Sequence, residues 1–440
     1  MTKLISKFWL GLALFFCNQV NANLTIISDE ETELYLQDIV HPIFKAANVP
    51  YNRNKIFIVD DKTLNAFVSD GNDLFINTEV FLRAKSSDEI SGVIAHEVGH
   101  IQGGHILRQK LRMQEMQNIS LASMVIAGAV GAMSGRGDVA MAMGLGTYSS
   151  LLNQSLSYRV EEERSADEAA IKILNKIKKS PQGLLDFMKK IQVQNKLRGI
   201  DEVSYFRTHP MTSERISFLS NAVRQSPFKP IKLSQDEALK RIQAKLFAFT
   251  KHPSQTAIKY PSSDNSIEAK YAHAIVAFKK LNPKKALKLI NESIRKEPRN
   301  PHFRELKGQI LLEHGKIDEA KKEFYLAAEL LPNSNLFKIN VAQAVLEGEP
   351  TETELNKIIR DLRKVQTERQ MLIGWLLLSK ACEKKGLRAE AEYAAAEFSF
   401  HLRDLKLAKR QAERAKKQSM LPALTLKIED LIRRIKNLER

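Results

Sequence analysis

His96, Glu97 and His100 form the pattern His-Glu-x-x-His in a chain of 440 residues that contains ten histidines. In an α-helix, residues four apart lie on one face, so both imidazoles can present a nitrogen to one metal ion. Glu97 lies beside that face, where its carboxylate can accept a proton from water. The alternative is a surface helix with two unrelated histidines. The spacing favours one Zn2+ per chain and metal-assisted hydrolysis, with Glu97 as the catalytic base.

The third metal ligand decides the class of such a site, because a catalytic zinc site usually has three protein ligands. In one class, another histidine follows six residues after the second, but that position is Ile106 here. His105 lies about 100° around the helix from it. We therefore interpret His105 as a residue behind the ligands or at the surface.

The other class takes a carboxylate from a separate helix, and the run Glu161-Glu162-Glu163 supplies candidates. Glu163 and Asp167 are four residues apart, so Glu163 can ligate the metal while Asp167 orients a ligand histidine through its free ring N–H. A solvated acidic face explains Glu161 and Glu162 adequately. The spacing alone does not choose among the three glutamates.

Three motifs together resemble a known family: Val-Ile-Ala-His-Glu-Val-Gly-His, Glu163-x-x-Ala166-Asp167, and Thr208-His209-Pro210-x-Thr-x-Glu-Arg215. The combination is similar to the periplasmic β-barrel assembly-enhancing proteases, which are gluzincins related to HtpX and the CaaX-prenyl endopeptidases. In that family the ligand glutamate lies four residues before the aspartate, so the resemblance implies Glu163.

The resemblance also implies roles for His209 and Arg215. It places the His-Pro segment near the zinc, where His209 can occupy the open coordination position in a latent state. The alternative is a neutral histidine that only packs the segment. Arg215 is expected either to donate to a developing oxyanion or to fix Glu214 or Asp167.

The elements around the motif follow from hydrophobic periodicity. The Ser87-Asp88-Glu89 cap predicts a helix that runs through His96 and His100 toward Gln117. The runs Ile56–Val59 and Leu74–Ile76 predict a small β-sheet.

Asn65, Ala66 and Phe67 lie between these two strand-forming runs. Cleavage requires an extended substrate backbone across the metal, and we interpret this segment as a candidate edge strand for it. An ordinary closed sheet edge fits the sequence equally well.

Residues 119–152 are rich in Ala, Gly, Ser and Met, in two apolar stretches broken at residues 134–138. Each stretch is shorter than the roughly 18 residues that indicate a membrane span. We predict a mobile hairpin over the active site that makes peripheral contact with a membrane surface. A buried helical hairpin is the alternative.

Residues 1–22 have the pattern of a secretory signal peptide: Lys3 and Lys7, the apolar run Phe8–Cys17, and the small-residue site Val20-Asn21-Ala22. A retained membrane anchor is the alternative. Export from a Gram-negative-type cell predicts a periplasmic location.

The chain has two cysteines, and cleavage after Ala22 leaves only Cys382, so no internal disulfide is expected. Cys382 lies in an apolar helical pattern, which predicts a buried thiol.

The net charge of +17 is uneven: residues 1–227 hold 25 basic and 24 acidic groups, and residues 228–440 hold 43 and 27. We predict a peptidase domain at 23–227, a linker at 228–232, and a second domain at 233–440. A basic domain suits acidic proteins or anionic membranes. An exported protein meets little nucleic acid, so we expect no nucleic-acid partner.

The basic half shows a period of 34 residues, typical of tetratricopeptide repeats, since Pro298 and Pro332 are 34 apart. The best unit is Pro301–Pro332, and another starts at Met371 or Leu372. The intervening segment, Asn335–Gln366, fits poorly and predicts a degenerate repeat. Helical patterns at Ala238–Phe247 and Leu405–Leu438 predict that the stack extends at both ends.

The expected fold class is α+β, mostly α: a gluzincin-type metallopeptidase domain with a small sheet, followed by an all-α tetratricopeptide-repeat solenoid. The expected function is a periplasmic zinc endopeptidase. By resemblance, its partners are misassembled outer-membrane proteins and the barrel assembly machinery, recruited through the repeats, and a chaperone-like role is expected beside proteolysis. The second interpretation is a periplasmic chaperone or scaffold with a latent or vestigial metal site.

Overall fold

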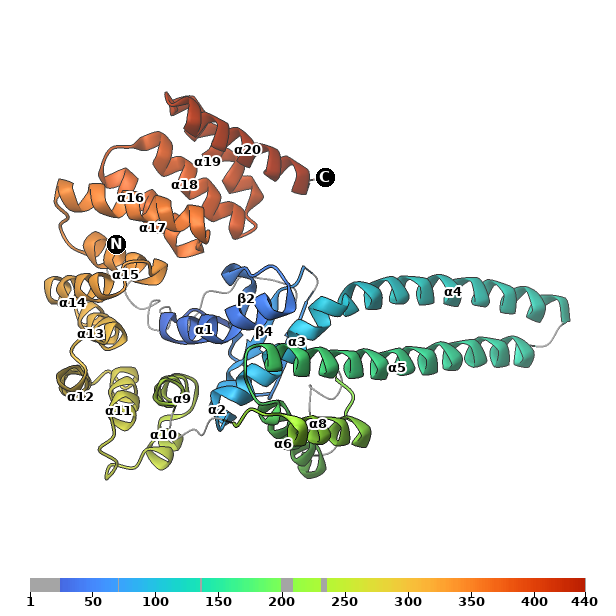
Figure 1. The fold of residues 1–440 in the computed structure, drawn as a ribbon. Helices are drawn as coiled ribbons and strands as arrows, with labels where there is room; N and C mark the ends of the chain where they lie inside the picture. Colours follow the sequence, from blue (N-terminus) through green and yellow to red (C-terminus); the bar gives the residue numbers. More distant parts are fainter. Residues whose placement is uncertain (1–23, 70, 135–136, 199–208, 231–235, 440) are drawn as a thin grey trace. The chain divides into compact units, whose positions relative to one another are not determined.

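The structure, a computed structural model, describes residues 24–69, 71–134, 137–198, 209–230 and 236–439 (Figure 1). Within residues 120–134, 137–156 and 194–198 it describes the helical backbone only. The predicted signal peptide at residues 1–22 lies outside the described residues. The chain divides into two compact units, one ending at Leu246 and one running from Phe247 to the C-terminus, with Asp29–Glu31 assigned to the second.

A four-stranded mixed sheet lies in the first unit, with strand order β1-β2-β4-β3. Its strands are β1 (Ile26–Ile27), β2 (Ile56–Val59), β3 (Ala66–Val68) and β4 (Leu74–Asn77). β2 and β4 are parallel, whereas β1 and β3 pair antiparallel at the two edges. The predicted small sheet is confirmed, although β1 was not predicted.

Helices bury one face of this sheet. The helices of the unit are α1 (Glu30–Ala47), α2 (Thr78–Arg83), α3 (Ser87–Gly103), α4 (His105–Ser134), α5 (Gly137–Lys176), α6 (Gln182–Arg198), α8 (Ser213–Gln225) and α9 (Glu237–Thr250). Alternate strand residues such as Ala66, Leu74 and Ile76 enter one apolar core with residues of α1, α3, α5 and α6. The core therefore supports α3, the helix that carries the His-Glu-x-x-His motif.

The helix α3 is shorter than predicted. It ends at Gly103, because Gly104 adopts a left-handed conformation with φ of 64°, and α4 begins at His105. Glycine favours this conformation because it has no Cβ. The predicted continuous helix toward Gln117 is therefore wrong: the chain turns directly after the motif.

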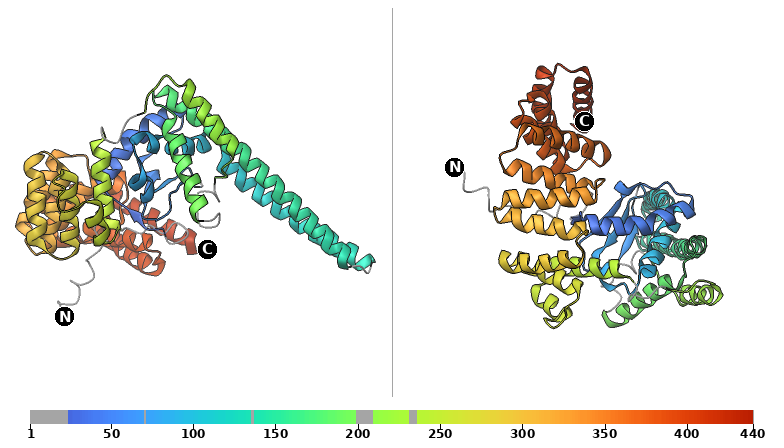
Figure 2. Two further views of the ribbon diagram at one scale, coloured as in Figure 1. Left: turned by 90° about the horizontal axis from the view of Figure 1, so that it is seen from below. Right: turned by 60° about the vertical axis from the view of Figure 1, so that its left-hand side comes forward.

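The helices α4 and α5 form a long hairpin, and Figure 2 shows them side by side. α4 ends at Ser134 and α5 begins at Gly137, which agrees with the predicted break at residues 134–138. No helix among the described residues has an apolar run long enough to cross a bilayer.

The second unit consists of paired helices of tetratricopeptide type (Figure 1). After α10 (Pro253–Lys259), the helices are α11 (Ile267–Lys279), α12 (Pro283–Lys296), α13 (Pro301–Glu313), α14 (Ile317–Leu330), α15 (Asn335–Glu347), α16 (Glu352–Glu368), α17 (Leu372–Lys384), α18 (Arg388–His401), α19 (Leu405–Gln418) and α20 (Pro422–Glu439). The predicted units at Pro301–Pro332 and from Leu372 are the pairs α13–α14 and α17–α18. The predicted fold class is thereby confirmed.

The segment predicted as a degenerate repeat also forms a helical pair, α15 and α16. Its second helix has 17 residues and begins at a capping box formed by Thr351 and Glu354. Ile358 and Leu362 are buried, so the irregular spacing is accommodated by a longer helix.

The helix α9 does not extend the repeat stack, contrary to the prediction for Ala238–Phe247. Leu239, Ile242 and Leu246 belong to the core of the first unit. The Gln243 side chain also donates to the backbone oxygens of Phe81 and Ala84, at 2.8 Å each. Apolar periodicity predicts that a helix is buried, but not against which neighbours.

Candidate metal centre

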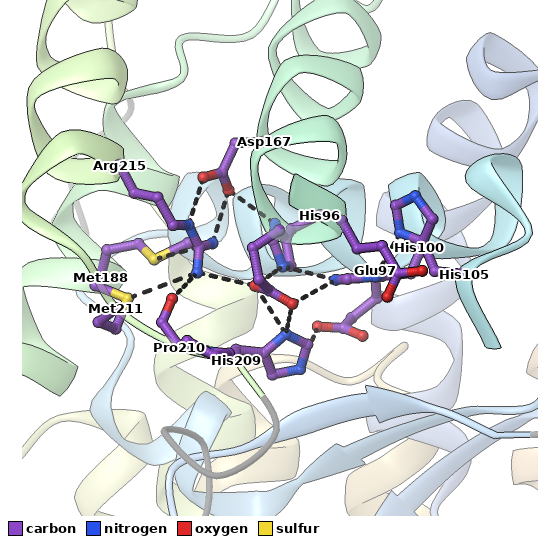
Figure 3. Close-up of polar contacts among 12 residues, drawn as sticks. His96, Glu97, His100, His105, Asp167, Met188, His209, Pro210, Met211 and Arg215 are labelled. Carbon is purple, nitrogen blue, oxygen red and sulfur yellow. Dashed lines mark hydrogen bonds and ion pairs between the residues drawn. The ribbon is translucent and has the colours of Figure 1, made fainter. Parts of the chain in front are cut away.

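The centre of the site is the pair His96 and His100, one turn apart on α3. Their Nε2 atoms lie 3.1 Å from each other, and both side chains are buried. Figure 3 shows both rings turned toward the same space. Two imidazoles in this arrangement present converging nitrogen donors.

Glu163 on α5 completes the set. Its carboxylate oxygens lie 3.3 Å from the Nε2 atoms of His96 and of His100. Close packing of α3 on α5 makes this approach possible, since a Cβ at Gly99 would lie only 2.8 Å from the backbone oxygen of Ala166. The three glutamates thus differ in direction: Glu161 is exposed, Glu162 pairs with Arg112 at 2.5 Å, and Glu163 is buried at the histidines.

Asp167 and Arg215 hold these side chains from behind. Asp167 Oδ1 lies 2.9 Å from His96 Nδ1, as expected for a carboxylate that orients a ligand histidine. Arg215 donates from Nε and Nη2 to Asp167, at 2.7 and 2.9 Å. Its Nη1 lies 2.8 Å from Glu163 and also donates to the backbone oxygen of Pro210. These contacts occupy the guanidinium, so they favour the positioning role over the oxyanion role.

His105 supports the other histidine. Its Nδ1 lies 2.8 Å from Nδ1 of His100, and the side chain is buried. The left-handed turn at Gly104 places it there, since a continuous helix would direct it elsewhere. The sequence left this residue undecided between a place behind the ligands and the surface, and the structure places it behind His100.

His209 also reaches the cluster. Its Nδ1 lies 3.0 Å from Glu163 Oε1, and its Nε2 lies 3.6 Å from Glu97 Oε1. One ligand atom each from His96, His100, Glu163 and His209 can be chosen so that all lie within 4.8 Å of one another. His209 is buried, and Figure 3 shows its ring facing the Glu97 carboxylate.

The chain is similar in sequence to known proteins. Residues 30–223 match peptidase family M48. Over 224 residues, the chain is 30% identical to a protease HtpX homolog of Thermococcus sibiricus, covering 43% of this chain and 74% of that protein. The chain belongs to peptidase family M48.

This M48 metalloprotease has further relatives that match most of its length. It is 22% identical over 389 residues to the beta-barrel assembly-enhancing protease of Yersinia pestis, covering 87% of this chain and 79% of that protein. It is 24% identical over 392 residues to a putative protein of the same name from Vibrio cholerae, covering 85% and 78%. The family resemblance carried by the motifs is thereby confirmed.

The donor set of the M48 site fits a zinc ion. Two imidazole nitrogens and one carboxylate are a usual ligand set for catalytic zinc, and each histidine is held through its other ring nitrogen. Burial lowers the pKa of His100 to about 3, so this ring is neutral and offers a lone pair. At His96 burial also lowers the pKa, but hydrogen bonds and the charges of Asp167 and Glu163 outweigh it and raise the pKa to about 10.

Glu97 lies beside the donor set rather than within it. The side chain is 1% exposed, and burial raises its pKa although His209 opposes the shift. A carboxylate with a raised pKa accepts a proton more readily than an exposed one. The carboxylate of Glu163 differs: burial raises its pKa, but the charge of His209 and hydrogen bonds from His100 and His209 lower it well below the usual value.

The predicted substrate strand is not part of this cluster. Asn65 precedes β3, and Ala66 and Phe67 lie in it. β3 packs beside α3, the helix of the two histidines, and among the described residues it pairs only with β4. An open strand edge therefore lies along the motif helix.

Proposed function

We propose that this M48 metalloprotease is a zinc-dependent endopeptidase that cleaves an extended peptide bound along β3. The convergence of His96, His100 and Glu163 beside the buried Glu97 carries this proposal. The two histidines lie on α3 and Glu163 lies on α5, so the donor set is brought together by the packing of two helices.

The chemistry divides among the residues of the chain. A bound zinc ion makes water more acidic and polarises a carbonyl oxygen. Glu97 accepts the proton of the attacking water and donates it to the leaving amine. Asp167 fixes the ring of His96, and Arg215 fixes both Asp167 and Glu163. The chain's part is thus to hold the ligands and to move one proton.

Substrate binding is assigned to Asn65, Ala66 and Phe67. The strand edge can add a peptide by main-chain hydrogen bonds, which hold the scissile bond straight. Among the residues that the structure describes, the buried Oδ1 atom of Asn65 has no hydrogen-bond partner, so it is suited to accept from a substrate N–H.

His209 is proposed as a latent ligand that leaves the metal before cleavage. Its position among the four candidate ligands supports this proposal. Replacement by alanine should then raise the cleavage rate of a test protein. Unchanged or lower activity of His209→Ala would favour a packing role.

We assign the protein to the periplasm and its substrates to misassembled outer-membrane proteins. The signal-peptide pattern of residues 1–22 and the relatives named for enhancing β-barrel assembly support this. The basic repeat unit is suited to recruiting substrates or the barrel assembly machinery. Peripheral membrane contact through residues 119–152 stays a prediction.

Zinc content together with casein cleavage tests the enzymatic function. Glu97→Gln should retain one zinc per chain and lose about a thousandfold in activity, because only proton transfer is removed. Full peptidase activity in this variant would refute the assignment of Glu97.

A periplasmic chaperone with a latent site is the second candidate, favoured by the position of His209 beside Glu97. Cleavage of an unfolded protein separates the two functions, because suppression of its aggregation is compatible with both. If the protein is only a chaperone, Glu97→Gln would suppress aggregation as the wild type does, and neither the wild type nor His209→Ala would cleave.

A further inference from the structure

Three phenylalanines form a stacked ladder across the sheet. Phe57 on β2 lies opposite Phe75 on β4, and Phe67 on β3 lies opposite Phe75 from the other side. Ring centroids are 5.0 Å apart in both pairs, with interplanar angles of 20° and 11°. The middle ring, Phe75, is 2% exposed, whereas the two outer rings are partly exposed.

This ladder lies on the face of the sheet opposite the core. The neighbouring strand residues Ala66, Val68 and Ile76 point into the apolar core, and none of the three phenylalanines belongs to it. The ladder therefore ends at Phe67, whose ring has an aromatic neighbour on one side, toward β4.

Hydrogen bonding defines which backbone groups face the open edge. Asn77 N donates to Asn65 O, and Ser69 N donates to Asp73 O, at 3.0 and 2.9 Å. In an antiparallel pair, alternate residues direct their backbone groups to the same neighbour. The backbone N–H and C=O groups of Asn65, Phe67 and Ser69 thus point toward β4. Those of the intervening Ala66 and Val68 point away from β4, toward the open edge.

A peptide that pairs antiparallel with Ala66 and Val68 has a defined register around Phe67. The peptide residue opposite Phe67 then forms a non-hydrogen-bonded pair, in which the Cα atoms lie only about 4.5 Å apart and the side chains are closest. Its side chain shares the face of the ladder, because side chains alternate along both strands.

We propose that Phe67 selects an aromatic side chain at this substrate position, as the fourth ring of the ladder. The inference rests on the proposed function, in which β3 binds the substrate. Outer-membrane strands alternate in polarity and are rich in aromatic residues at the membrane interfaces. Unfolded segments of such strands supply an extended chain with an aromatic side chain on one face.

The test uses fluorescein-labelled peptides of threonine and serine, with or without a single phenylalanine, and the full-length Glu97→Gln protein. We expect the phenylalanine peptide to bind about fivefold more tightly by fluorescence anisotropy, the size of an aromatic pair contribution. This preference should disappear in a Phe67→Ala background and persist in Phe67→Tyr. Equal binding of the two peptides, or a preference that survives Phe67→Ala, would overturn the inference.

Cleavage by the wild-type protein separates this inference from the proposed function. As the phenylalanine is moved along the peptide, the cleaved bond should follow it at a constant offset, read by mass spectrometry. A cleavage position that does not change when the phenylalanine is moved would count against the inference alone. A binding preference with no cleavage by either the wild type or His209→Ala would instead reject the endopeptidase and leave the aromatic site standing.

Discussion

The two units of the chain bury different kinds of groups. The first unit buries a connected set of ionisable side chains, including Glu97, Glu163, Asp167 and Arg215. In the repeat unit the buried helix contacts are mainly apolar and often small, as at Ala320, Ala327 and Ala394. Its ion pairs include at least one partly exposed partner, as in Arg363–Glu390 and in the pair of Arg434 with the buried Glu397. Removing one member of a buried polar network lowers the unfolding free energy of a protein strongly. In stacked repeats the unfolding free energy is distributed over many similar interfaces. Single changes should therefore act strongly in the first unit and weakly in the second.

The largest effect on stability is expected for Asp167→Ala. This change leaves the Arg215 cation, which is 3% exposed, without the carboxylate that accepts two of its hydrogen bonds. Breaking such a buried pair costs about 3–5 kcal/mol of unfolding free energy. Loss of the contact to His96 should also weaken zinc binding about 10- to 100-fold. Denaturant unfolding and zinc titration measure the two effects.

The matched control is Asp167→Asn, which retains the size and an acceptor oxygen and should lose less. The chain's two tryptophans are Trp9 and Trp375, so after removal of residues 1–22 the fluorescence reports only on the repeat unit. A stability loss in Asp167→Ala that appears equally in Trp375 fluorescence would contradict the contrast between the units.

A smaller effect is expected from one added methyl group at two packed glycines. At Gly99 a Cβ would meet the backbone of Ala166 at 2.8 Å, and backbone cannot move aside easily. At Gly308 the Cβ would meet the Phe324 ring at 2.7 Å, which is a side chain. Overpacking costs about 1–3 kcal/mol. Gly99→Ala should therefore lower both stability and zinc affinity, and Gly308→Ala only the stability of the repeat unit.

Zinc affinity and casein cleavage are to be measured for both glycine variants. These measurements test whether only the change at Gly99 affects the metal site. Gly99→Ala with unchanged zinc affinity would show that the spacing of α3 and α5 does not control the ligands. Reduced zinc affinity in Gly308→Ala would show that the repeat unit influences the site.

The part of the site that could be predicted from the sequence is the part that depends on spacing within one helix. His96 and His100 lie within one helix, so their common face follows from the sequence alone. Glu163 required the family resemblance, since three adjacent glutamates differ only in their direction relative to α3. The contact of His105 with His100 depends on the left-handed turn at Gly104, which helical periodicity does not reveal.

For the fold, too, local patterns could be predicted from the sequence and long-range packing could not. Strand-forming runs and the 34-residue period identified the elements of both units, because these patterns are local. The placement of α9 was not predictable, since its apolar face fits either a repeat stack or the core that it joins. Long-range packing likewise decides that Arg215 contacts both Asp167 and Glu163.

The smallest effect is expected at Cys382, the single cysteine that remains after removal of residues 1–22. The thiol is fully buried in α17, and burial raises its pKa to about 12. At pH 8 only about one thiol in ten thousand is then ionised, and the thiolate is the reactive form. Iodoacetamide should not label the native protein, and removal of zinc by EDTA should leave the labelling rate unchanged. Rapid labelling in urea is the positive control. Faster labelling after EDTA treatment would show that the metal site stabilises the repeat unit, and the contrast between the two units would then have to be abandoned.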